Sequence, residues 1–179
     1  VTQRIEPVGP IDLTVRADTN LVLIITCTVR ADQTSLGTGL DTTPTLARWA
    51  AEGAHFSDMI ATAPWTRAAS TALVTGRTAS DLALAEPAPG MNDRALPLDA
   101  TTLAEVLSAE GWTTLGVTAN PNLNASFQFD QGFDQYVGLS GLWRSGLAKV
   151  PGTEVVRAAT RLLDEADPTS PTYLQLVFV

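Results

Sequence analysis

The distribution of apolar and polar positions divides the chain into strands and helices. Leu21–Thr26 is an unbroken apolar run rich in β-branched residues, which is typical of a strand buried on both faces of a parallel sheet. Similar runs over residues 112–118 and 173–179 predict two further strands. We expect the chain to end inside the last strand and so to expose its edge.

Between the strands, apolar residues recur at helical spacing. A helix is predicted over residues 43–53, where Thr43 and Pro44 favour the start and a glycine favours the end. A second helix is predicted over residues 102–111, because its first residues have the spacing of a capping box. A third is predicted over residues 155–163, ahead of a proline.

Strands that alternate with helices predict an α/β fold with a mainly parallel sheet and helices on both faces. Residues 1–19 lack periodicity and are interpreted as a leader or edge segment. Residues 20–179 are interpreted as one domain or part of one. Within them, residues 81–97 are predicted to be a proline-rich loop and residues 120–142 to be mostly irregular.

The composition is that of a folded chain with an acidic surface. The chain has 179 residues, of which 45% are hydrophobic and 17% charged, so it has enough apolar material for one core. A net charge of −8 disfavours nucleic acid and anionic lipid as partners. No apolar run is long enough to span a membrane and no secretory signal is visible, which favours the cytoplasm.

Two strand ends carry residues suited to ligand chemistry, because parallel α/β sheets bind ligands beyond the carboxyl ends of their strands. Cys27 follows the first predicted strand, and Asn120 lies just beyond the second, where it is a candidate substrate-binding residue. The local pattern alone favours the interpretation of Cys27 as an ordinary packed residue at a strand end. Arg30 and Asp32, in the same loop as Cys27, are placed to pair with each other.

A Pro-Trp pair at residues 64–65 precedes a helix-like run, so Thr66 is expected at or near a helix N-terminus. The amide groups and the dipole at such a terminus stabilise bound anions, which would place the hydroxyl beside a sulfate or phosphate ester. The alternative is that Thr66 is only an N-cap.

Several segments also occur in an order that carries a family resemblance. They are Asn20 to Thr26, Arg30-Ala31-Asp32, Thr43 to Ala47, Ala51-Glu52-Gly53, Ala63 to Arg77, Leu103 to Leu107, Gly111-Trp112 and Phe129 to Asp134. Together they resemble the sulfatase-like branch of the alkaline phosphatase superfamily. The resemblance covers roughly residues 20–179, and the family's domain is considerably longer. It therefore implies the N-terminal portion of a sulfatase-like domain, incomplete at its C-terminus.

The resemblance implies hydrolysis of a sulfate, phosphate or phosphonate ester by a nucleophile that a divalent metal supports. Thr66 matches the nucleophile position, and Arg67 beside it is a candidate anion-binding partner. Many sulfatases have there a cysteine that is oxidised to formylglycine, within a Cys-x-Pro-x-Arg pattern. Ala68 and Ser70 replace the proline and the arginine of that pattern, and threonine cannot form the aldehyde. We therefore expect no formylglycine and a metal-assisted threonine alkoxide instead.

The same alignment places Cys27 where the family usually has its first metal-binding aspartate, and Thr28 where a second acidic ligand often lies. Calcium prefers oxygen ligands, whereas zinc accepts sulfur, so Cys27 favours zinc or no metal. The remaining family ligands lie downstream of the last strand. His55 is interpreted as a surface or loop residue, and the pair at positions 92 and 93 as a turn.

Two functions from different classes follow. The first is a sulfatase-like hydrolase, which this chain alone would not complete because the downstream ligands are absent from it. The second is an inactive sulfatase-derived fragment that binds an anion, or binds a partner or second copy through the exposed sheet edge. Five aromatic residues of the irregular region are expected to be packing rather than a carbohydrate platform; they are Phe127, Phe129, Phe133, Tyr136 and Trp143.

Overall fold

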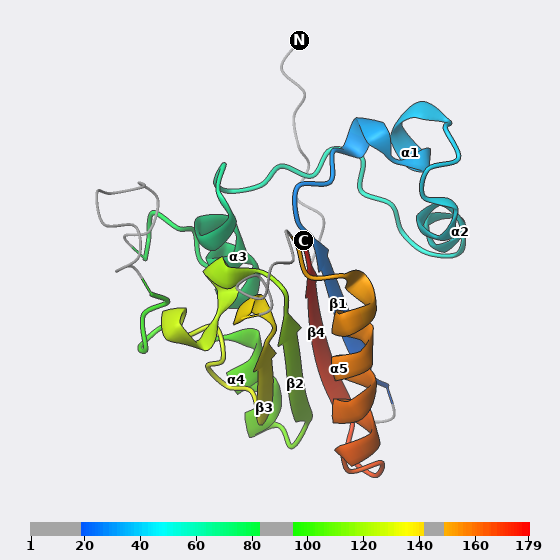
Figure 1. Ribbon diagram of the computed structural model, residues 1–179. Coiled ribbons are helices and arrows are strands. Elements are labelled where there is room, and N and C mark those ends of the chain that lie inside the picture. Colours follow the sequence, from blue (N-terminus) through cyan, green and yellow to red (C-terminus); the bar gives the residue numbers. More distant parts are fainter. Residues whose placement is uncertain (1–18, 83–94, 142–148) are drawn as a thin grey trace.

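The computed structural model describes residues 19–82, 95–141 and 149–179 of the chain (Figure 1). Nearly all of the predicted leader, most of the predicted proline-rich loop, the pair at positions 92 and 93, and Trp143 lie outside the described residues.

Four parallel strands form one sheet. They are β1 (Leu21–Thr26), β2 (Thr113–Thr118), β3 (Gln135–Gly138) and β4 (Thr172–Phe178), in the spatial order β1-β4-β2-β3. Every pair of neighbours is parallel, so the carboxyl ends of all four strands lie at the same edge of the sheet (Figure 1). The predicted parallel sheet is confirmed, and β3 is a short strand in a region that the sequence predicted to be mostly irregular.

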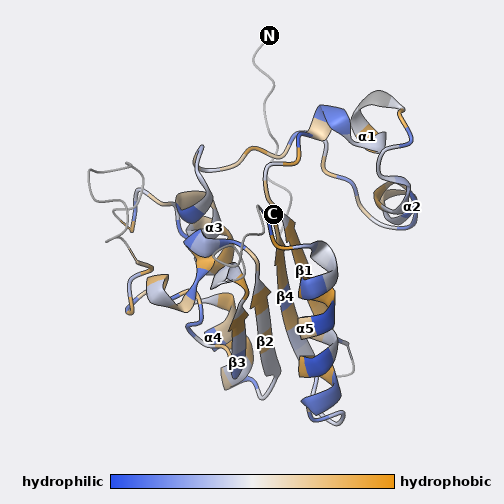
Figure 2. Ribbon diagram, in the orientation of Figure 1, coloured by the Kyte–Doolittle hydropathy of each residue, from blue (hydrophilic) through white to orange (hydrophobic). Residues whose placement is uncertain are grey.

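Helices cover both faces of the sheet, as predicted. The helical elements are η1 (Ala31–Gln33), α1 (Ser35–Thr38), α2 (Pro44–Glu52), α3 (Thr66–Thr75), α4 (Leu103–Ala109), η3 (Pro121–Leu123), η4 (Ala125–Phe127) and α5 (Gly152–Glu165). None of the described helices combines the length and apolar character that a bilayer-spanning segment needs. Figure 2 shows hydrophobic residues along the strands, and alternating hydrophobic and hydrophilic bands along α5.

The two faces of β4 pack against different helices, because successive side chains of a strand point in opposite directions. Leu174 and Leu176 belong to the cluster that includes the buried side of α5. Tyr173 packs with Ala104 and Leu107 of α4, which lie on the other face. The alternation makes β4 a strand buried on both sides, and every one of its residues but the last is buried.

The sequence-based prediction was wrong about which strand forms the edge. It placed β1 in the interior and the last strand at an open edge, whereas β4 lies between β1 and β2. The exposed fractions of Val22 and Ile24 in β1 are 53% and 43%. The physical reason is that α5 packs over β2 and β4, so one face of β1 stays open.

The first helices stand apart from the sheet (Figure 1). The structure confirms α2 at the predicted position, but this helix has no buried residue, and the apolar side chains of Leu46 and Trp49 are exposed. Thr43 is its N-cap residue, as predicted, but makes no side-chain capping bond, and its hydroxyl accepts a hydrogen bond from the amide of Ser35 instead. Residues 31–53 therefore form a small helical extension held mainly by its own contacts.

The aromatic residues of the region after β2 are packing residues within the described part of the chain, as predicted. Phe129 is buried among residues of the α3 side of the core. The Phe133 ring stacks on Tyr173 at a centroid distance of 5.7 Å and lies 5.1 Å from Tyr136.

The predicted capping box of α4 is confirmed and is joined to the segment before β3. The Thr102 hydroxyl accepts from the Glu105 amide at 3.1 Å, and the Thr102 amide donates to Glu105 Oε2 at 2.8 Å. Gln131 Nε2 donates to the same carboxylate oxygen at 2.9 Å. Gly132 follows with φ +83°, and a Cβ there would lie 2.3 Å from the Glu105 backbone nitrogen. The close approach therefore requires glycine at position 132.

Gly132→Ala should destabilise the fold by about 3 kcal/mol, because the new methyl group would overlap the backbone of α4. Gly111→Ala is the matched control, since Gly111 has the same φ of +83° and no atom within contact distance of a new Cβ. That control should lose only about 1 kcal/mol, the ordinary cost of a left-handed alanine. Urea unfolding measures the stability loss of both variants, from the shift of the midpoint when the m-value is unchanged. Equal losses would contradict the packing role of Gly132.

Candidate functional site

Thr66 is the first residue of α3, so the structure places its hydroxyl at a helix N-terminus, as expected. The N-cap residue is Trp65. Its backbone is extended, and its side chain makes no capping hydrogen bond. The N-cap interpretation of Thr66 was therefore wrong by one position. Amide groups of the first turn point out of this end of the helix, where they and the dipole favour negative charge.

Three residues that the sequence analysis singled out lie together at the carboxyl edge of the sheet. Cys27 continues the pairing of β1, because its amide donates to the carbonyl of Phe178 at 3.0 Å. Cys27 Sγ lies 4.0 Å from Thr66 Oγ1, and the same sulfur accepts a hydrogen bond from Asn120 Nδ2 at 3.4 Å. The loop after β1, the loop after β2 and the start of α3 therefore meet at Cys27.

The orientation of the Asn120 side chain follows from its neighbours. Asn120 has an exposed fraction of 4%, and its Oδ1 accepts from the Asn122 amide at 2.9 Å. A backbone N–H can only donate, so this bond assigns the oxygen of the carboxamide to Asn122 and leaves its NH₂ group toward Cys27. Asn120 therefore presents a donor to the candidate site.

Arg67 lies in the interior rather than on the surface of the site. Its exposed fraction is 1%, and its guanidinium carbon lies 3.5 Å from the centroid of the Phe127 ring. Its Nε and Nη2 atoms donate to the carbonyl and side-chain oxygens of Asn122 at 3.4 and 3.3 Å. Burial lowers the pKa of Arg67, although a guanidinium keeps its proton near neutral pH. The side chain predicted to bind the substrate anion thus contacts the loop after β2.

The loop that follows Cys27 is strained. Thr28 has φ +60°, which is unfavourable for a β-branched residue, and such strain is concentrated at functional sites. Arg30 and Asp32 pair through two hydrogen bonds, as predicted, and this contact lowers the pKa of the Asp32 carboxyl. The Asp32 carboxylate is thereby directed to Arg30.

The donor atoms around Cys27 do not make a metal site on their own. An amide NH₂ and a threonine hydroxyl are its polar side-chain neighbours, and a calcium ion takes six to eight oxygen ligands. Among the described residues, no three His, Cys, Asp or Glu side chains are grouped as metal ligands. His55 is exposed in the loop after α2, as predicted. The described residues therefore do not form a complete calcium or zinc site by themselves.

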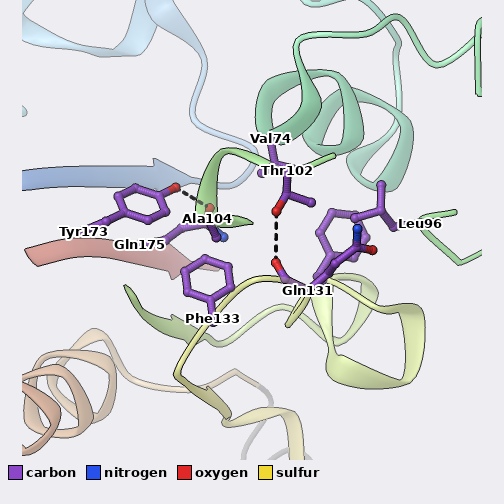
Figure 3. A pocket seen from close by; sticks show the side chains of 9 residues that line it. Val74, Leu96, Thr102, Ala104, Gln131, Phe133, Tyr173 and Gln175 are labelled. Carbon is purple, nitrogen blue, oxygen red and sulfur yellow. Dashed lines mark hydrogen bonds between the residues drawn. The ribbon is translucent and has the colours of Figure 1, made fainter. Parts of the chain in front are cut away.

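A small cavity elsewhere in the molecule is a separate feature (Figure 3). It has a volume of about 10 Å³ and lies between the sheet and the α3–α4 side, lined in part by Thr102, Gln131 and Gln175. Gln131 Oε1 is buried there without a hydrogen-bond partner among the described residues. A cavity of this size holds about one water molecule, so it does not accommodate an ester substrate.

Two residues that support the site were not predicted to do so from the sequence. Asn122 was given no role of its own and Phe127 was predicted only to be packing, yet both contact Arg67. The available signal was the Asn-Pro-Asn sequence directly after a strand, since such turns direct side chains back onto backbone amides.

Solved structures with the same fold include Ps i-CgsB in complex with k-i-k-neocarrahexaose, with a TM-score of 0.68 and 20% identity over 89% of this chain and 44% of that one. BT4656, in complex with its substrate D-glucosamine-2-N,6-O-disulfate, has a TM-score of 0.71 and 20% identity over 89% of this chain and 34% of that one. A protein of the alkaline phosphatase superfamily from Vibrio parahaemolyticus has a TM-score of 0.63 and 24% identity over 90% of this chain and 40% of that one. The chain spans less than half the length of each.

No curated protein matches the chain. The family model described as Sulfatase matches it over residues 19–178, which include Cys27, Thr66 and Asn120. A match of this extent establishes the family, and the chain belongs to the sulfatase family.

Proposed function

We propose that the chain is the part of a sulfatase-like hydrolase that carries the nucleophile, with Thr66 attacking a sulfate, phosphate or phosphonate ester. The observation that carries the proposal is the position of the Thr66 hydroxyl. It lies at the first residue of α3 and 4.0 Å from Cys27 Sγ, at the carboxyl edge of a parallel sheet. Family membership supports the reaction class.

The chemistry is a transfer in two steps. Thr66 Oγ1 bonds to the sulfur or phosphorus of the ester, the bond to the alcohol oxygen breaks, and the alcohol leaves with the proton of the threonine hydroxyl. The oxygen of a water molecule then bonds to the sulfur or phosphorus, the bond to Thr66 Oγ1 breaks, and sulfate, phosphate or phosphonate leaves while a proton of the water restores the threonine hydroxyl. The Asn120 NH₂ group and the first-turn amides of α3 lie where they would stabilise the negative oxygens during both steps.

Proteins of this superfamily generally use divalent metals. A metal would supply Lewis-acid activation of the hydroxyl, and Cys27 is the described residue that we propose as a ligand. Sulfur there favours zinc over calcium. Further ligands would have to come from outside the described residues, since these hold no group of three.

A second candidate function is association with another copy through β1. Among the described residues, β1 pairs only with β4, and Val22 and Ile24 expose apolar surface on its open face. An exposed apolar edge strand is a template for pairing with another strand. This candidate keeps the predicted self-association and moves it from the last strand to the first.

Thr66→Ala should lower hydrolysis of chromogenic aryl sulfate, phosphate or phosphonate esters by roughly a thousandfold or more, because the nucleophile is removed. Thr66→Ser should keep measurable activity. Thr75→Ala is the matched control, since this threonine lies at the far end of the same helix and bonds the Thr71 carbonyl. Hydrolysis by the Thr66→Ala protein at the wild-type rate would exclude Thr66 as nucleophile. Because this chain alone is not expected to complete the metal site, the comparison is made in a longer chain that also carries the downstream ligands. Absence of hydrolysis by the wild-type form of that longer chain would favour the binding functions.

Cys27→Asp should shift metal preference from zinc toward calcium, because a carboxylate replaces a thiolate. Calorimetric titration with each ion measures the shift. Cobalt titration of the wild-type protein should give a sulfur-to-metal charge-transfer band that Cys27→Ala abolishes. If metal affinity is the same in the wild-type, Cys27→Asp and Cys27→Ala proteins, Cys27 is not a metal ligand.

If β1 mediates association, the wild-type chain should sediment as a dimer or larger species at high concentration. The Val22→Lys/Ile24→Lys double variant should shift it to monomer, because two charges would then face the apolar contact. Leu98→Lys is the control, because Leu98 is exposed on another part of the chain. A wild-type chain that remains monomeric at all concentrations would contradict this candidate.

A further inference from the structure

The Arg67 side chain closes a ring of contacts around the candidate site. From α3 it donates to both oxygens of Asn122, at 3.4 Å to the carbonyl and 3.3 Å to Oδ1. The Asn122 amide donates to Asn120 Oδ1 at 2.9 Å, and Asn120 Nδ2 donates to Cys27 Sγ at 3.4 Å. Cys27 Sγ lies 4.0 Å from Thr66, the residue that precedes Arg67.

We propose that Arg67 is a positioning residue that fixes which end of the Asn120 carboxamide faces Cys27, beside Thr66. A carboxamide can present either its oxygen or its NH₂ group. The Asn122 amide selects the oxygen and so directs the NH₂ group toward Cys27, while Arg67 holds Asn122 in place. The inference rests on the proposed function, because the ester would bind beside the Thr66 hydroxyl.

The shape of the Arg67 contacts explains why an arginine is suited to this role. The carbon atom of its planar guanidinium lies 3.5 Å from the centroid of the Phe127 ring, which is within cation–π distance. The same plane carries the donors that meet the two oxygens of Asn122. A lysine ammonium has donors but no flat face, so it could replace only part of the contact. With an exposed fraction of 1%, Arg67 is also shielded from competition by water.

The consequence concerns the charge of the ligand. With its oxygen held by Asn122, Asn120 presents a hydrogen-bond donor beside Cys27 rather than an oxygen ligand. A donor suits a negative ester oxygen, whereas a cation requires the oxygen. Arg67 thus contributes to anion recognition indirectly, through the orientation of Asn120.

The test uses the reactivity of Cys27, which is the only cysteine of the chain. Its rate of reaction with a chromogenic aromatic disulfide reports on the contact with Asn120 Nδ2. Asn120→Ala should change this rate roughly fivefold, as expected for the loss of one hydrogen bond. Arg67→Gln should change it by nearly the same factor in the same direction. The double variant should show no further change, since both substitutions remove one shared constraint.

Two further variants test the geometry. Arg67→Lys should give an intermediate rate, because the planar face is lost while one donor remains. Arg77→Gln is the matched control for the removal of a positive charge, since Arg77 is exposed just beyond the other end of α3, and it should leave the rate unchanged. If Arg67→Gln does not fold, Asn122→Ala replaces it and should shift the rate in the direction of Asn120→Ala.

A purely structural role of Arg67 would lower the unfolding midpoint and leave the Cys27 rate at its wild-type value. That result would overturn the proposal, as would effects of Arg67→Gln and Asn120→Ala that multiply in the double variant. An unchanged rate in Asn120→Ala would overturn it too. The rates are measured without an ester, so their outcome is independent of whether Thr66 hydrolyses one.

Discussion

The parallel pairing of β4 with β1 on one side and β2 on the other is the constraint on which the site depends. Parallel strands end at the same edge, so the residues after β1 and after β2 are brought within reach of each other across one intervening strand. Cys27 and Asn120 are 93 positions apart in sequence, yet Asn120 Nδ2 lies 3.4 Å from Cys27 Sγ. β4 can hold this central place because helices bury both of its faces.

Much of the fold was predictable because its signals are local. The strands β1, β2 and β4 are apolar runs, and the capping box of α4 needs only the spacing of Thr102 and Glu105. The spatial order of the strands was not predictable in the same way. An apolar run is compatible with a centre or an edge position, and the difference is decided by where α5 packs. β3 escaped prediction because its four residues carry little periodicity.

The site was predictable as a set of positions but not as a set of contacts. The rule that ligands bind beyond strand ends selected Cys27 and Asn120, and the helix start selected Thr66. Arg67 was assigned to the substrate because it neighbours Thr66 in sequence. Adjacent residues of a helix point about 100° apart, however, so a residue beside a surface position readily faces the interior. Its burial on Phe127 could only come from the packing of the loop after β2.

These contacts bear on what a sulfatase fold can do with a cysteine at this strand end. A carboxylate at position 27 would repel an anionic ester unless a cation lay between them, and this chain has no carboxylate at that position. The neighbouring Asn120 NH₂ group and the amides of α3 are donors as well. All three features favour a negative ligand at this edge of the sheet. Under the proposed function, the described chain would supply the Thr66 hydroxyl and the donors that attract an anion, and activation of that hydroxyl would draw on ligands outside the described residues.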